Sequence, residues 1–265
     1  MDKTSIIGII LGIVAVGVGM YFKGVDPSVL LNPAALLIIF AGTAAAVTIA
    51  FPTNEIKNVP KLFKVLFTEQ KLQSQEEYIK MFVEFATLAR KEGLLSLEAK
   101  VNEIDDLFLK NGLNLAIDGQ SPEFIRDVMM EEIEAMEERH LANAGIFSQA
   151  GMYAPTLGVL GAVLGLIAAL GNMEDIEALG HAIAAAFVAT LFGIFTGYVL
   201  WHPFSNKLKR KSKQEVKIKQ LIVEGVLSVQ EGQAPGIIQQ KLASYLPINQ
   251  RIQFLAQGEK QDAEK

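Results

Sequence analysis

The sequence predicts an all-α integral membrane protein: four transmembrane helices with long cytoplasmic helical extensions. Hydrophobic residues make up 51% of the 265-residue chain, and its mean hydropathy of +0.31 is too high for an ordinary soluble domain. Charged residues still make up 20%, but they are segregated from the long apolar runs. Two of these runs, 142–173 and 178–206, contain no Asp, Glu, Lys or Arg. Each can cross a bilayer, since about 20 helical residues cover a hydrocarbon core of ~30 Å.

The first predicted span is 5–22, which follows Met1-Asp2-Lys3. An apolar stretch at this position can also be a cleaved signal peptide, and Gly17-Val18-Gly19 has the small-x-small form of a cleavage site. Three further spans follow, however, and the residues before the stretch are barely basic. We therefore expect a retained transmembrane helix.

The other predicted spans are 33–51, 144–173 and 180–203. Asn32-Pro33 opens the second span, with proline at the first helical position, where it is favoured. An acidic turn at 174–177 separates the last two spans.

Lysine and arginine residues predict that both termini and the central loop are cytoplasmic. Flanks rich in these residues stay inside the cell. They follow the second and fourth spans at Lys57, Lys61, Lys64, Lys207, Lys209, Arg210, Lys211, Lys213, Lys217 and Lys219. We therefore expect transmembrane helices in 1–51 and 144–203, a cytoplasmic helical domain in 52–143, and a cytoplasmic C-terminal helix and tail in 204–265.

The central loop is predicted to be helical. Ser74-Gln75-Glu76-Glu77 is a capping box that opens an amphipathic helix, which ends at Gly93. Ser121-Pro122 opens another helix, and nothing interrupts it before the membrane, so we expect one continuous helix over 122–173. The fourth span is expected to continue through the basic segment in the same way. The polar tail after Ala256 is expected to be disordered.

The sequence shows no recognisable catalytic or metal site. It has no Cys, which excludes disulfides and thiolate chemistry, and its three His are too scattered to bind a metal together. No nucleophile–base pair is apparent, so we expect neither an enzyme nor a metal site nor a cofactor. No basic–aromatic module points to nucleic acid.

No predicted span contains a carboxylate. Ion pathways usually need an ionisable group at membrane depth. If this protein moves an ion, the titrating group must therefore come from a partner, which disfavours a self-contained transporter.

Pro155, Thr156 and Thr190 each leave two interpretations open. A membrane proline is either tolerated, because neighbours satisfy the freed carbonyl, or it makes a hinge or turns a carbonyl towards a pore. A membrane threonine most often donates to the carbonyl three or four residues earlier. The alternative is a hydroxyl directed at an ion site or at a partner's carboxyl group.

Three GxxxG pairs predict a tightly packed bundle: Gly8/Gly12, Gly161/Gly165 and Gly193/Gly197. They permit close helix crossing, either within the chain or between copies. Arg90 and Glu98 are by default solvated surface charges. The basic run after the fourth span is by default a topology signal that contacts anionic lipid.

Four sequence blocks resemble the MotA family of flagellar stator subunits. They are RKEGLLSLE at 90–98, APTLG at 154–158, ATLFG at 189–193 and WHPF at 201–204, supported by FIRD at 124–127 and the run 131–139. The blocks occur in the family's order and on the family's side of the membrane, and the resemblance covers nearly the whole chain. Each block alone is weak evidence, but together they are specific.

The resemblance implies a function and partners. It implies an ion-driven stator subunit in the bacterial inner membrane, a homopentamer around a MotB-type partner whose transmembrane helix carries the Asp that this chain lacks. Ion flow turns the ring and delivers torque to the rotor protein FliG. Pro155 matches the family's proline beside the ion site, and Pro203 matches its second proline. Thr190 matches the hydroxyl that faces the partner's Asp, and Arg90 and Glu98 match the charges that engage the rotor.

The transported ion is expected to be H⁺, although a hydroxyl at Thr156 would also help to hold Na⁺. The nearest alternative function is a proton-driven motor subunit of the ExbB/TolQ type, which energises outer-membrane processes. Proteins of that type resemble three-span chains with an outside N-terminus, whereas this chain has four spans and a loop carrying Arg90 and Glu98. A structural membrane scaffold without ion flux is a third interpretation.

Overall fold

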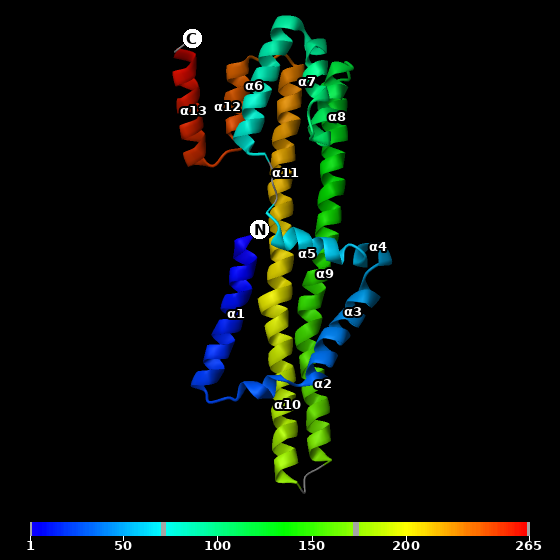
Figure 1. Ribbon diagram of the computed structural model, residues 1–265. Coiled ribbons are helices and arrows are strands. Elements are labelled where there is room, and N and C mark those ends of the chain that lie inside the picture. Colours follow the sequence, from blue (N-terminus) through cyan, green and yellow to red (C-terminus); the bar gives the residue numbers. More distant parts are fainter. Residues whose placement is uncertain (1, 70–72, 172–174, 264–265) are drawn as a thin grey trace. The chain divides into compact units, whose positions relative to one another are not determined.

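The computed structural model describes residues 2–69, 73–171 and 175–263, and every regular element within these ranges is helical (Figure 1). The chain divides into two compact units. Unit one consists of Met1–Gln70 and Arg139–Lys211, and unit two of Lys71–Glu138 and Ser212–Lys265.

Four helices of the described residues are long and apolar enough to cross a membrane. Two are α1 (Lys3–Phe22) and the continuous run of α2 (Pro33–Leu36), η2 (Leu37–Ala41) and α3 (Gly42–Ala50). The others are α9 (Pro122–Leu170) and the run of α10 (Ile176–Phe195), η4 (Thr196–Trp201) and α11 (His202–Gln230). The predicted four-span, all-α fold is confirmed. Asn172 and Met173 of the third predicted span, and Glu174 of the acidic turn, lie outside the described residues.

Local capping groups set the ends of α2 and α6 as predicted. The Asn32 side chain accepts a hydrogen bond from the Ala35 N–H at 3.1 Å and opens α2. Ser74 and Glu77 form the complete capping box of α6 (Gln75–Glu92). That helix ends at Gly93, whose φ of 87° lies in the left-handed region that favours glycine. These caps are short-range features, which is why they could be predicted from spacing alone.

Two π-helical turns, η2 and η4, were not predicted. In η4 the His202 N–H donates to the Gly197 carbonyl, five residues earlier. Pro203 follows directly and has no N–H to donate. The wider turn therefore accommodates this proline without breaking the helix, which continues from Ile176 to Gln230.

A polar clamp at the start of α1 holds the C-terminus of α5 (Val59–Phe67). The Asp2 N–H donates to the Phe67 carbonyl at 2.9 Å, and Lys211 donates to the Val65 and Thr68 carbonyls at 2.6 and 2.8 Å. These bonds satisfy carbonyls that a helix end leaves without partners.

The Asp2 carboxylate pairs with Lys207 at 2.7 Å, and the hydrogen bond from Lys207 lowers the pKa of Asp2 to about 2. Lys207 and Lys211 therefore bind residues of their own chain. The sequence predicted that the basic run sets the topology and contacts anionic lipid. For these two residues that interpretation is incomplete, because they also bind other segments of the chain.

Aromatic rings form the core beside this clamp. Phe147 of α9 packs edge-on against Phe63 and Phe204, with ring centroids 5.3 and 6.1 Å apart, and stacks on Trp201 at 6.1 Å. Such offset and edge-on geometries suit the ring quadrupole. They tie α5 to α9 and to the junction of η4 with α11.

Unit two has a separate hydrophobic core. It is built by α6, η3 (Leu94–Leu97), α7 (Glu98–Asn102), α8 (Leu107–Ile117), α12 (Pro235–Ala243), α13 (Ile248–Ala263) and the unit-two parts of α9 and α11. Phe82, Leu113, Ile125 and Leu221 are completely buried in it. The predicted helical character of the central loop is confirmed.

The predictions for the helix from residue 122 and for the C-terminal tail have different outcomes. The helix predicted from residue 122 is continuous, and α9 runs to Leu170. The prediction of a disordered tail after Ala256 is wrong, because α13 continues to Ala263. Phe254 explains part of the difference: it is buried in the unit-two core and anchors this helix.

Glu224 on α11 links three helices of unit two. Its carboxylate accepts from Arg126 of α9 and from Lys241 of α12, both at 2.8 Å. Burial opposes ionisation, but the hydrogen bonds from Lys241 and Arg126 outweigh it and hold the pKa of Glu224 below its ordinary value. The ionised carboxylate is therefore the form that stabilises this unit.

We predict that Glu224→Gln lowers the stability of the folded protein by about 1 kcal/mol, since two charge-assisted bonds are weakened and the half-exposed Arg126 is screened by water. The wild-type contribution is fully present above the ordinary pKa of 4.5 and is lost as pH falls through the lower pKa of the folded protein. Melting temperature measured against pH should show the two proteins converging at acid pH. A difference that stays constant down to acid pH would contradict this role.

Candidate functional site

The contact between α9 and α10 is made by small residues. A Cβ added to Gly158 would lie 2.9 Å from the Ala189 carbonyl oxygen and 3.1 Å from the Gly193 Cα. A Cβ added to Gly193 would lie 2.6 Å from the Ala154 carbonyl oxygen. The two backbones therefore touch, and no side chain fits between them.

This close contact extends along both helices. The residues that form it recur every three or four positions: Gly151, Ala154, Gly158, Gly161 and Gly165 on α9, and Ala186, Ala189, Gly193 and Gly197 on α10 and η4. Two of the predicted GxxxG pairs thus pack within the chain. In the remaining pair, Gly12 lies against Val199 and Gly8 has open space around it.

Pro155 lies in this interface without breaking α9. A Cβ on Gly197 would lie 2.8 Å from the Pro155 Cγ and 2.9 Å from the Gly151 carbonyl oxygen, so the proline ring packs where η4 has no side chain. The structure favours the tolerated-proline interpretation for the helix as described, since α9 continues on both sides of Pro155.

Thr190 and Thr156 both donate to the carbonyl four residues earlier, but at different lengths. The Thr196 hydroxyl donates to Phe192 at 2.8 Å, a typical length, whereas Thr156 donates to Met152 at 3.2 Å and Thr190 to Ala186 at 3.4 Å. The Thr190 bond is at the limit of the range and weak. Its hydroxyl is only loosely held by its own helix.

Thr190 also lines a groove of about 570 Å³ between α1 and α10. The other lining residues are apolar apart from the Tyr198 hydroxyl, and Val16 is the contribution of α1.

Thr156 is exposed on α9, and Pro203 is exposed just after η4. Pro155 and Thr190 therefore lie at successive turns of the contact between α9 and α10. Thr156 and Pro203 lie instead on the outer surface of unit one.

Arg90 and Glu98 belong to unit two and are exposed. Arg90 lies in the last turn of α6 and Glu98 begins α7, on either side of Gly93 and η3. Neither forms an ion pair within residues 2–69, 73–171 and 175–263. Both charges are therefore available to a partner.

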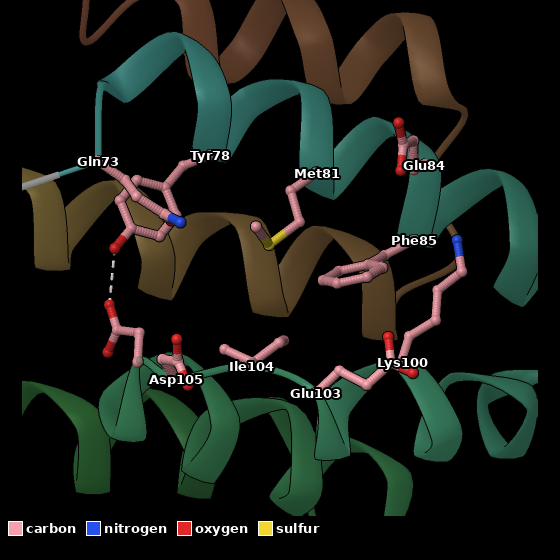
Figure 2. Close-up of a pocket in the computed structure, with 10 residues that line it drawn as sticks. Gln73, Tyr78, Met81, Glu84, Phe85, Lys100, Glu103, Ile104 and Asp105 are labelled. Atoms are coloured by element: carbon pink, nitrogen blue, oxygen red, sulfur yellow. Dashed lines mark hydrogen bonds between the residues drawn. The ribbon is translucent and has the colours of Figure 1, made fainter.

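A cleft of about 660 Å³ lies beside these elements, between α6 and the segment that joins α7 to α8 (Figure 2). Tyr78 donates a 2.7 Å hydrogen bond across it to Asp106, which also caps α8. Burial, with the Asp106 carboxylate, raises the pKa of Tyr78. The neutral phenol thus stays a donor and fixes the walls of the cleft.

No role was predicted for His202. Its ring atoms lie 2.8 to 2.9 Å from the position of a Cβ on Gly151, and the ring stands 5.4 Å from Tyr198. The imidazole fits here because the facing helix has a glycine at this position. The sequence signal for this contact is therefore the His of the WHPF block together with a glycine in the preceding span. No group of three or more His, Asp or Glu side chains suited to a metal occurs in the described part of the chain.

Comparison with known proteins gives matches along the whole chain. Residues 100–220 match the model of the MotA/TolQ/ExbB proton channel family, and residues 6–93 match the motility protein A N-terminal region. Motility protein A of Bacillus subtilis (strain 168) is 68% identical over 265 residues, which are 100% of this chain and 98% of the relative.

Two solved structures have the same fold. A chain of the flagellar MotAB stator complex from Bacillus subtilis superposes with a TM-score of 0.91 at 68% identity, covering 96% of this chain and 99% of that one. A chain of C. jejuni MotAB superposes with a TM-score of 0.89 at 33% identity, covering 94% and 97%.

We predict that Gly193→Ala destabilises the protein by about 1–3 kcal/mol, because the added methyl group meets backbone atoms that cannot move aside. Gly180→Ala, on the same helix, is the matched control: nothing lies within 4 Å of its added Cβ, and alanine is the better helix former. Melting temperatures of the purified protein in detergent measure both. Equal effects of the two substitutions would mean that the helices do not touch at Gly193.

Proposed function

This chain belongs to the motility protein A group of the MotA/TolQ/ExbB proton channel family, and we propose that it is the A-type stator subunit that converts an ion-motive force into torque on the flagellar rotor. The observation that carries the proposal is the whole-length match: 68% identity over 265 residues to a motility protein A, with a TM-score of 0.91 to a chain of a flagellar stator complex. A shared fold without such identity would support the architecture alone.

A MotB-type partner completes the ion path in this proposal. The spans carry no carboxylate, and the solved relatives are MotAB complexes, so the partner supplies the transmembrane Asp. The A-type chains assemble as a homo-oligomer, expected to be a pentamer, around the partner's helices. No cofactor is required, because the moving charge is itself the source of energy.

The proposed ion path follows the helix pair α9–α10. Thr190 faces the partner's Asp, and its 3.4 Å bond to Ala186 leaves the hydroxyl free to turn towards that carboxyl group. Pro155, Thr156 and Pro203 complete the surface along the path. One elementary charge that falls through ~150 mV releases about 3.5 kcal/mol. That energy shifts an equilibrium between two helix packings by more than roughly a hundredfold.

The proposed ion is H⁺. The matching family model describes proton channels, and the Thr156 hydroxyl already donates to Met152. Protonation of the partner's Asp removes a buried charge, and the ring then advances by one subunit. Na⁺ stays the alternative, since the Thr156 oxygen still has lone pairs to offer.

The proposed location is the bacterial inner membrane with both termini in the cytoplasm. The basic flanks after the second and fourth spans support this orientation. It places unit two and its exposed Arg90 and Glu98 on the side of the rotor protein FliG, which these charges engage in our proposal.

The ExbB/TolQ alternative shares the match at residues 100–220 but does not explain the match at 6–93 to a motility protein A. The region 6–93 includes nearly all of the first span and the whole of the second. They favour the flagellar function over a motor that energises the outer membrane.

We expect the chain, expressed with its MotB-type partner, to restore swimming to cells that lack stators. Swimming speed should fall to zero with a protonophore and should not depend on external Na⁺. Dependence on Na⁺ with resistance to the protonophore would replace H⁺ by Na⁺ in the proposal. Failure to restore swimming, together with rescue of an ExbB- or TolQ-deficient strain, would establish the alternative function.

Thr190→Ala is expected to abolish most swimming without loss of the protein from the membrane, since a hydroxyl directed at the partner's Asp is removed and its packing is nearly kept. Thr87→Ala is the matched control, because Thr87 is exposed on α6 and its hydroxyl donates to Val83 at 2.8 Å. If cells with Thr190→Ala swim as well as those with Thr87→Ala, the ion-path role of Thr190 is wrong.

Arg90→Glu is expected to reduce motor torque under load while leaving membrane insertion and assembly intact, since it reverses an exposed charge that has no partner among the described residues. Torque of tethered cells is the measurement. Lys91→Glu, a charge reversal at the next exposed position, tests whether the effect is specific to Arg90. Equal torque in wild type and Arg90→Glu would exclude a rotor contact through this side chain.

A further inference from the structure

Unit two carries two exposed stripes of opposite charge, one on α9 and one on α11. The acidic stripe consists of Glu131, Glu134 and Glu138 of α9, and the basic stripe of Lys213 and Lys217 of α11. Residues at these spacings share one face of a helix. All five side chains are exposed, and neither the proposed ion path nor the proposed rotor contact uses them.

The acidic stripe lies on the side of α9 that faces away from the core of unit two. The buried face of this helix is formed by Ile125, Met129 and Ile133. At 3.6 residues per turn, Glu131 and Glu134 point to the opposite side. This face of α9 therefore remains open to a partner.

The charges of the two stripes have no opposite partner within residues 2–69, 73–171 and 175–263, where the ion pairs join other residues. Along each helix, the charged residues three and four positions away have the same sign, as in Glu134 with Glu138 and Lys213 with Lys217. Such like-charge pairs destabilise a helix. Charges of opposite sign from outside the chain relieve this repulsion.

Contacts inside unit two show that α9 and α11 run antiparallel and stay in step. Gln230 of α11 donates to the Gln120 carbonyl, just before α9 begins. Arg126 and Glu224 form the next contact, six residues further along α9 and six residues back along α11. One residue forward on α9 therefore corresponds to about one residue back on α11.

This register places the stripes at the same level. Glu131 lies five residues beyond the Arg126–Glu224 contact on α9, and Lys217 lies seven residues beyond it on α11. Glu134 and Lys213 lie eight and eleven residues beyond it. At 1.5 Å per residue, each acid is level with its lysine to within about 5 Å, which is less than one helical turn. The offset has the same direction in both pairs, so both can form together.

Anionic lipid does not account for the basic stripe. Lys213 and Lys217 follow Pro203, the end of the fourth predicted span, by ten and fourteen residues. Along α11 these intervals are about 15 and 21 Å, whereas the potential of a membrane surface decays within a Debye length of about 8 Å. A lipid also leaves the acidic stripe without a partner.

A second copy of this chain matches both stripes. We propose that the acidic stripe of one copy pairs with the basic stripe of the next copy in the homo-oligomer of the proposed function, on which this inference rests. In a ring, two different surfaces of each copy meet its two neighbours. The axis of a ring in a membrane stands along the bilayer normal, so equivalent residues of all copies lie at one level. Exposed ion pairs add little affinity, but opposite charges fix register and orientation.

Cross-linking tests which residues meet. The chain has no Cys, so a disulfide between two copies joins introduced residues. Two differently tagged full-length copies, one with Glu134→Cys and one with Lys213→Cys, are expressed with the MotB-type partner and oxidised in membranes with copper–phenanthroline. We expect a covalent dimer that carries both tags.

Glu132→Cys in place of Glu134→Cys is the matched control. Glu132 is exposed on the same helix at nearly the same level, but it lies off the acidic stripe. Paired with Lys213→Cys, it should give little mixed dimer.

Charge reversal tests the attraction. Glu131→Lys with Glu134→Lys should weaken the oligomer, seen as loss of the assembled complex in size-exclusion chromatography at low salt. Lys213→Glu with Lys217→Glu should do the same. All four reversals in one chain should restore the complex, because the two stripes then exchange signs.

The proposal is overturned if the tagged copies form no mixed dimer, if the Glu132→Cys control forms as much, or if the fourfold reversal is no better than either half. Swimming of wild type with its partner subunit separates the two levels of the argument. Normal swimming without the mixed dimer rejects the stripe contact and leaves the proposed function intact, whereas absence of swimming rejects the proposed function itself.

Discussion

The backbone contact between α9 and α10 is the constraint on which the rest of unit one depends. Gly158 and Gly193 meet with no side chain between them, so the two helices pack as one rigid pair. Pro155 is tolerated because Gly197 leaves room for its ring. Since the interior of the pair is filled by backbone, the polar side chain of Thr156 lies on its surface, where a partner can reach it.

In the proposed function, the distribution of charge makes this chain one half of an ion site. The spans carry no carboxylate, so they need no internal counter-charge and can enter the membrane at low cost. The charged residues that bind within the chain do so at helix ends and outside the spans, as Asp2 does with Lys207 and Glu224 with Arg126. Because Asp, Glu, Lys and Arg are confined to regions outside the spans, the proposed ion path along the helix pair offers hydroxyls to the charge that a partner brings.

Most of the fold was predictable because its signals are local. Apolar runs give the spans, and a capping box such as that at Ser74 gives a helix start within three residues. The π-helical turns were not predictable, since they depend on how a helix adjusts to a proline or to a neighbour. The C-terminal tail was misjudged because its composition is polar, whereas one side chain, Phe254, docks in a core formed by distant segments.

The sequence by itself determined the number of spans, the absence of a carboxylate within them and the blocks that carry the family resemblance, because each is a property of consecutive residues. Only the tertiary structure decided which glycines touch, that the Thr190 bond is long, and that Lys207 pairs with Asp2 while Lys211 binds the end of α5. The glycine contacts and the lysine bonds depend on distances between atoms of different helices, whereas the Thr190 bond depends on the local shape of α10. Such distances are set by packing, which no spacing along a single chain specifies.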